Sequence, residues 1–243
     1  MRKLLVIPIV HNAADLGRLE HRLEQLKRAT MPRERIEASR KQVARFWEEL
    51  RVAIEAWQLD FAKVVVYQDA LPFAPATHVG LEIKIVKELA AVGSANHQLL
   101  EWMHEHGARI LGTESPELLV AEYSLVRKQL GLSNNPTLNQ ATPRSLKITA
   151  ETNCETTCET TDETTDEATE IAAQLADLLN RRDQFIAARI DTTLEQDQTG
   201  IILIGMLHSV EKWLPEDIEV DFPIGQPKPT IVGQASNLSA ATS

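Results

Sequence analysis

The sequence has few cysteines, few aromatic residues and no long apolar run. Two of its 243 residues are cysteines and 5% are aromatic. A small fold stapled by several disulfide bonds is therefore excluded. No apolar run reaches the roughly 18 residues of a membrane-spanning helix, so we expect no membrane partner. The apolar stretch at the N-terminus runs into His11 without a small-residue cleavage site, which favours a buried strand over a signal peptide and predicts a cytoplasmic protein.

Positive charge is also in the minority. Lysine and arginine total 25 residues, aspartate and glutamate total 35, and the net charge is −10. An acidic surface disfavours attraction to phosphate backbones, so we expect no nucleic-acid partner. The length and the 43% of hydrophobic residues suit one globular domain with a sizeable core, which is compatible with an enzyme.

One segment differs in composition from the rest of the chain. Residues 148–170 repeat a four-residue unit, Cys-Glu-Thr-Thr, in which Asp later replaces Cys. Because this acidic stretch can bury little apolar surface, we predict a disordered acidic insertion over 133–167. Both cysteines belong to the repeat, which favours copies of a repeating unit over a zinc site. The tail over 223–243 is predicted to be unfolded, and 1–132 and 168–222 are predicted to be two parts of a single domain.

Apolar runs alternate with segments of helical period in the remainder of the chain. Continuous apolar runs are typical of strands buried on both faces, and apolar residues at helical spacing indicate amphipathic helices. The predicted strands cover 3–10, 62–67, 108–111 and 201–206, and the predicted helices cover 15–29, 33–59, 80–106, 115–131, 167–190 and 210–214. This alternation predicts an α/β fold with a mainly parallel central sheet and flanking helices.

Polar residues stand at the ends of the predicted strands. His11, Asp69, Glu114 and His208 each lie at or just beyond such an end, and ligands bind at the carboxyl edge of parallel sheets. Imidazoles and carboxylates suit a divalent ion such as zinc, manganese or iron, with His11, His208 and Glu114 as candidate ligands. Without a metal, the same groups suit general acid–base chemistry. The alternative for each residue taken singly is a structural role in capping loops or helix ends.

The other polar residues indicate a functional role less clearly. Arg182 lies in the middle of the last long predicted helix, between Arg181 and Asp183. The three form either a solvated patch or a clamp in which the Arg182 guanidinium stabilises a developing oxyanion. His97 and His104 lie in a predicted helix with a polar face, and we interpret them as solvated.

The end of the chain resembles a known family. The pattern Arg182-Asp183-x-x-Ile186-Ala187-x-x-Ile190, followed by Gly205-x-x-His208, resembles the closing motif of the TraB/Tiki superfamily, which includes the erythromycin esterases and ChaN-like proteins. The resemblance implies an α/β core whose G-x-x-H strands face one pocket, with metal-dependent or His/Glu hydrolysis in some members. It assigns His208, Arg182 and, more loosely, Glu114 to the site. The first strand departs from the pattern, because Pro8 stands where glycine is expected and changes the local backbone.

Two functions of different classes follow from these residues. The first is hydrolysis of a peptide or ester bond in a small-molecule or peptide substrate. His11 and His208 then bind a metal or act as acid and base, Glu114 is a ligand or general base, and Arg182 steadies the oxyanion. The second is a non-catalytic protein on the same scaffold that binds a small ligand or regulates a partner. A helical interaction protein, based on Trp47 and Trp57, ranks last because such residues are more often core.

Overall fold

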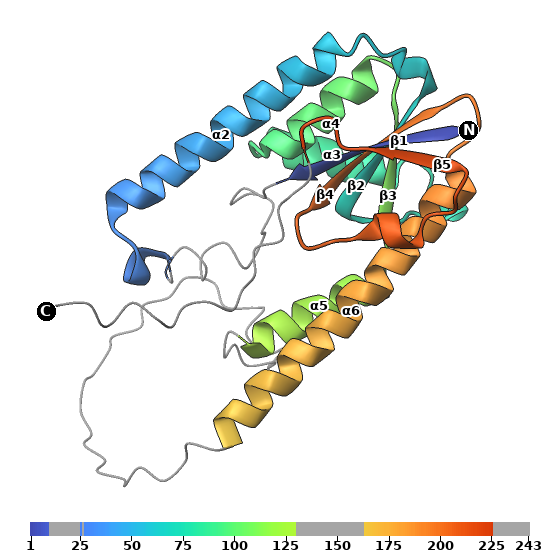
Figure 1. Cartoon of the computed structure of the whole chain (residues 1–243). Helices are drawn as coiled ribbons and strands as arrows, with labels where there is room; N and C mark the ends of the chain where they lie inside the picture. Colours follow the sequence, from blue (N-terminus) through green and yellow to red (C-terminus); the bar gives the residue numbers. More distant parts are fainter. Residues whose placement is uncertain (10–24, 26, 130–162, 226–243) are drawn as a thin grey trace, which may run out of the picture.

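A five-stranded sheet forms the centre of the protein in a computed structural model (Figure 1). The structure describes residues 1–9, 25, 27–129 and 163–225. The strands are β1 (Arg2–Ile9), β2 (Val64–Pro72), β3 (Arg109–Glu114), β4 (Thr199–Gly205) and β5 (Ile218–Asp221). They lie in the order β3-β2-β4-β1-β5, and every pairing is parallel. The predicted α/β fold with a parallel sheet is confirmed.

Helices cover both faces of the sheet. The long helices are α2 (Arg33–Ala56), α3 (Leu81–Ala91), α4 (Ala95–Glu105), α5 (Pro116–Gln129) and α6 (Glu163–Thr193), and short 3-10 helices are η2 (Phe61–Lys63), η3 (Ala76–His78) and η5 (Val210–Trp213). In Figure 1, α2 and α4 lie on one side of the sheet, and α5 lies beside α6 on the other. Within the described part of the chain, no helix has the length and apolarity that crossing a membrane requires.

The direction in which the chain crosses the sheet explains this division. From β1 to β2 and on to β3, the chain moves toward one edge by way of α2, α3 and α4. From β3 to β4 it moves back by way of α5 and α6. Because parallel crossover connections are right-handed, connections that run in opposite directions lie on opposite faces. The sheet is therefore buried on both sides.

Two apolar layers flank the strands. Alternate residues of a strand point to opposite faces, so Ile7 belongs to the layer beneath α2 and α4, whereas Val6 belongs to the layer beneath α6. Trp47 of α2 is 4% exposed, and Trp57 packs against the same layer. Trp47 is a core residue and Trp57 is partly buried against the core, which argues against a free interaction helix.

The predicted helix over 80–106 is wrong, because two helices occupy this range. α3 ends before Gly93, which has φ +93°, a left-handed conformation that stops a helix at little cost for glycine. Ser94 then caps α4, since its Oγ accepts a hydrogen bond from the His97 backbone N–H at 3.3 Å.

Other boundaries differ at the ends of the insertion and of the chain. α6 begins at Glu163, before the predicted start at 167. β5 was not predicted, and it extends the sheet by pairing with β1. Most of the predicted insertion, of the predicted tail and of the predicted helix over 15–29 lies outside the described residues, so those predictions stay untested.

β2 is irregular where it reaches the carboxyl edge of the sheet. Its pairing with β3 shifts register between Gln68 and Pro72, and Ala70 has a φ of 62°. Such an irregularity bends a strand and redirects its side chains. The bend brings β2 onto Gly112 of β3, where an added Cβ would lie 2.3 Å from the Pro72 carbonyl oxygen.

Replacing Gly112 with alanine tests this close approach. The clash is with backbone that cannot rotate away, so we expect the unfolding free energy in urea to fall by about 1–3 kcal/mol. Gly200→Ala is the matched control, because its Cβ would meet the flexible end of the Leu4 side chain at 2.7 Å. A loss as large in Gly200→Ala would contradict the assigned backbone contact.

Candidate active site

Polar side chains gather at the carboxyl ends of three neighbouring strands. Asp69 lies in β2, Glu114 ends β3, and His208 follows β4. Their side chains are 4%, 0% and 5% exposed. Parallel topology places these strand ends at one edge, so residues that are distant in sequence meet there.

The Arg182 guanidinium joins these strands to the helices. Its Nη2 donates to Asp69 Oδ1 at 2.9 Å and to Glu114 Oε1 at 2.8 Å, and its Nε donates to Glu114 Oε2 at 3.1 Å. Its Nη1 donates to Glu122 Oε1 of α5 at 2.7 Å. The fork of Arg182 thus binds both oxygens of Glu114, the geometry of the strongest ion pairs.

Helical spacing explains why Arg182 points inward. It lies four residues before Ile186 and eight before Ile190, and both isoleucines are 0% exposed. The three residues therefore share the face of α6 that packs on the sheet. Arg182 is 4% exposed and Asp183 is 2% exposed, whereas Arg181 is exposed. The solvated-patch alternative is wrong for Arg182 and Asp183.

Two carboxylates hold the His208 ring between them. Its Nδ1 lies 2.5 Å from Asp183 Oδ1, and its Nε2 lies 3.6 Å from Asp69 Oδ2. Asp183 Oδ2 also accepts from the Ser209 backbone N–H at 2.9 Å, and Asp69 Oδ2 accepts from that of Gly205 at 2.9 Å. The backbone after β4 and the imidazole are thereby fixed to the same acids. We refer to Asp69, Glu114, Glu122, Arg182, Asp183 and His208 as the rim cluster.

The surroundings shift the protonation of two of these groups toward neutral pH. Burial raises the pKa of the Glu114 carboxyl to about 7, against the opposing effect of Arg182 and with a further contribution from Asp69. Burial alone would lower the pKa of His208, but its hydrogen bond to Asp183 and the charge of Asp69 outweigh burial and raise it above the ordinary value. Glu114 therefore exchanges its proton near pH 7, as a general acid or base requires.

The donor set of the rim cluster suits a divalent cation. Asp69, Glu114 and His208 each offer one ligand atom, and these atoms lie within 4.8 Å of one another. One imidazole nitrogen and two carboxylate oxygens match the preferences of zinc, manganese and iron. The rim cluster holds four carboxylates against one guanidinium and one imidazole, so its charge favours a cation.

The structure brings together most of the predicted site residues. Glu114, Arg182 and His208 all lie in the rim cluster. His11 lies outside the described residues, so its role as a ligand stays a prediction. Among the residues that were not assigned to the site, Asp183 adjoins Arg182 in the quoted motif. Glu122 has no sequence signal that separates it from a solvated helix residue.

One of the other histidines differs from the prediction. His97 was expected to be solvated, but it is 6% exposed, and its Nδ1 lies 2.7 Å from Ser94 Oγ. Because α4 begins directly after its cap Ser94, the His97 side chain lies on the buried face of this helix. His104, also predicted to be solvated, is exposed.

The rim cluster reaches the surface beneath α5. The Glu122 side chain is 35% exposed, and α5 itself has no buried residue. A weakly buried helix thus covers the site, and Glu122 marks the side from which solvent approaches.

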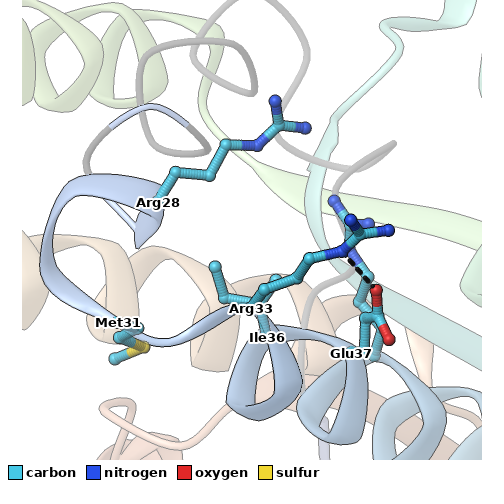
Figure 2. A pocket seen from close by; sticks show the side chains of 6 residues that line it. Arg28, Met31, Arg33, Ile36 and Glu37 are labelled. Carbon is cyan, nitrogen blue, oxygen red and sulfur yellow. Dashed lines mark hydrogen bonds and ion pairs between the residues drawn. The ribbon is translucent and has the colours of Figure 1, made fainter.

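A separate hollow of about 490 Å³ lies at the start of α2 (Figure 2). It is lined by Arg28, Met31, Arg33, Ile36, Glu37 and Arg40. Arg33 is paired with Glu37 at 2.8 Å. None of these residues belongs to the rim cluster, and the hollow is not part of the candidate site.

Comparisons with family models, with curated proteins and with solved structures found no match to the chain. The resemblance to the TraB/Tiki superfamily therefore stays a prediction.

Substitution of Glu114 by glutamine tests its raised pKa. A buried acid with a raised pKa stabilises the fold in its protonated form. That stability is present below the ordinary pKa of 4.5 and is lost as the pH rises to about 7. Between pH 4.5 and 8, the wild type should lose about 1–3 kcal/mol of unfolding free energy relative to Glu114→Gln, because His208 titrates in both proteins. Parallel stability curves for the two proteins, measured by denaturant titration, would refute the shift.

Proposed function

We propose that the protein is a hydrolase of ester or peptide bonds that acts at the rim cluster. The observation that carries the proposal is the convergence of Asp69, Glu114 and His208, whose ligand atoms lie within 4.8 Å of one another at the carboxyl edge of the sheet. A buried acid that titrates near neutrality, beside an imidazole oriented by Asp183, is a common basis for acid–base catalysis. The substrate is proposed to be a small molecule or peptide in the cytoplasm.

The residues of the rim cluster can divide the steps of hydrolysis among them. Ionised Glu114 takes a proton from water, and the water oxygen forms a bond to the acyl carbon. Arg182, the arginine of the rim cluster, is proposed to stabilise the negative charge that develops on the carbonyl oxygen. The bond from the acyl carbon to the leaving oxygen or nitrogen breaks, and protonated His208 donates its proton to the leaving atom. Asp183 acts through His208 as a positioning residue, because it binds Nδ1 and leaves Nε2 toward the site.

A zinc, manganese or iron ion fits the same residues. Asp69, Glu114 and His208 would hold it, and a bound ion lowers the pKa of its water and polarises a carbonyl. The ion must compete with Arg182, which already binds Asp69 and Glu114. The hydrogen bond from His208 Nδ1 to the Asp183 carboxylate is the kind of outer contact that orients a metal-binding imidazole.

A second candidate is a non-catalytic protein that binds a small ligand or regulates a partner. The side chains of Asp69, Glu114 and His208 are at most 5% exposed, and both oxygens of Glu114 bind Arg182. Burial and pairing of this kind favour a stable network of ion pairs that binds a ligand over a freely accessible catalytic centre.

Measurements on the purified full-length chain separate these functions. We would determine its metal content by elemental analysis, and assay p-nitrophenyl esters and a peptide library with zinc, manganese or iron(II) and after chelation. His208→Ala and Glu114→Gln should lower kcat/KM by 10²-fold or more, the range expected for loss of an acid or base, to about 10⁴-fold. His78→Ala and Glu88→Gln are matched controls at exposed positions and should retain activity.

The outcomes distinguish the alternatives. One ion for each chain, lost in Asp69→Asn, supports the metal-dependent hydrolase. Activity without metal, lost in His208→Ala, supports acid–base hydrolysis. Retention of both activity and metal content in a folded His208→Ala variant would overturn the hydrolase proposal. Saturable binding of a small ligand without turnover would favour the second candidate.

A further inference from the structure

The turn that follows β4 carries two apolar side chains beside the rim cluster. Met206 is 57% exposed and Leu207 is 82% exposed. Residues at the tips of turns are usually Gly, Pro, Asn, Asp or Ser, so an apolar pair at this position is unusual. Across the described ranges, these are the only large exposed hydrophobic residues that are adjacent in the sequence.

Hydrogen bonds hold this turn at both ends. The His208 backbone N–H donates to the Gly205 carbonyl at 3.2 Å and closes the turn. On one side the Gly205 N–H binds Asp69, and on the other the Ser209 N–H binds Asp183. The turn cannot rotate its apolar side chains inward without breaking contacts to the acids of the rim cluster. Single exposed apolar residues need no explanation, but an adjacent pair fixed beside a candidate site does.

The charge of the rim cluster restricts which ligands can bind beside this turn. Four carboxylates surround a single arginine and a single histidine, so the side chains leave no surplus positive charge for an anionic group. A bound divalent ion would at most balance the negative charge of these side chains. The charge of the rim cluster therefore disfavours an anionic substrate, and the apolar side chains of Met206 and Leu207 offer contact to an uncharged one.

We propose that Met206 and Leu207 bind the aliphatic acyl chain of an uncharged ester substrate. This inference rests on the proposed hydrolase function and names its substrate class. Leu207 directly precedes His208, and the backbone on either side of the turn binds Asp69 and Asp183, so an acyl chain on the turn would lie next to the rim cluster. Each methylene group of the acyl chain that is buried on binding increases the affinity by roughly fourfold.

A series of p-nitrophenyl esters tests the proposal. We would measure kcat/KM for the acetate, butyrate and octanoate esters with the full chain. The wild type should prefer octanoate to acetate by at least tenfold. The double variant Met206→Ser/Leu207→Ser should lose at least tenfold of this preference, mainly through KM. The swap Met206→Leu/Leu207→Met keeps the surface apolar and should keep the preference, as should Val52→Ser on α2, where Val52 is 60% exposed.

The outcomes separate this inference from the proposed function. If the wild type hydrolyses esters and the serine variant retains the chain-length preference, the acyl-chain surface is wrong and the hydrolase proposal stands. If only peptides are cleaved, the ester class is wrong. If nothing is hydrolysed, calorimetric titration with a non-cleavable octyl amide tests the surface alone. Binding that is lost in the serine variant supports it, and absence of binding to the wild type overturns it.

Discussion

The ion pairs of Arg182 are the interaction on which the rest of the structure depends. One guanidinium binds carboxylates from β2, β3 and α5, and it is itself carried by α6. Buried charges are tolerated only when they are paired, and loss of one partner leaves the others uncompensated. The Arg182–Glu122 pair links α5, which has no buried residue of its own, to α6. The same side chain thus links β2, β3, α5 and α6 at the edge of the sheet.

Structural and chemical roles meet in Asp69. One of its oxygens binds Arg182, and the other accepts from Gly205 and faces His208. Asp69 alternates with Val65 and Tyr67 of β2, which belong to the layer beneath α6, and so lies on the α6 side of the sheet. A change in the charge of Asp69 would therefore affect the Arg182 guanidinium, the turn after β4 and the His208 imidazole together. Such sharing favours a site that responds as a unit over a set of independent groups.

The sequence was informative where regular geometry determines position. Parallel strands must end at one edge, so Glu114 and His208 could be placed together before their contacts were known. Helical spacing from Ile186 and Ile190 could likewise have placed Arg182 on the packed face. Glu122 could not be predicted, because a glutamate on a helix surface looks the same whether or not an arginine lies opposite. The break at Gly93 was hidden because apolar spacing continues through it. β5 was missed because its four residues, Ile-Glu-Val-Asp, lie in a short polar stretch.

The strand order has a consequence for how the protein is made. β1 and β2 do not pair with each other, since β4 lies between them and pairs with both. A nascent chain that has emerged from the ribosome only as far as α5 holds β1 and the β2–β3 pair as separate pieces with open apolar edges. Contacts between segments this distant form slowly, and the exposed edges invite aggregation or chaperone binding in the meantime. The rim cluster is therefore complete only after α6, β4 and the turn that carries His208 have been translated.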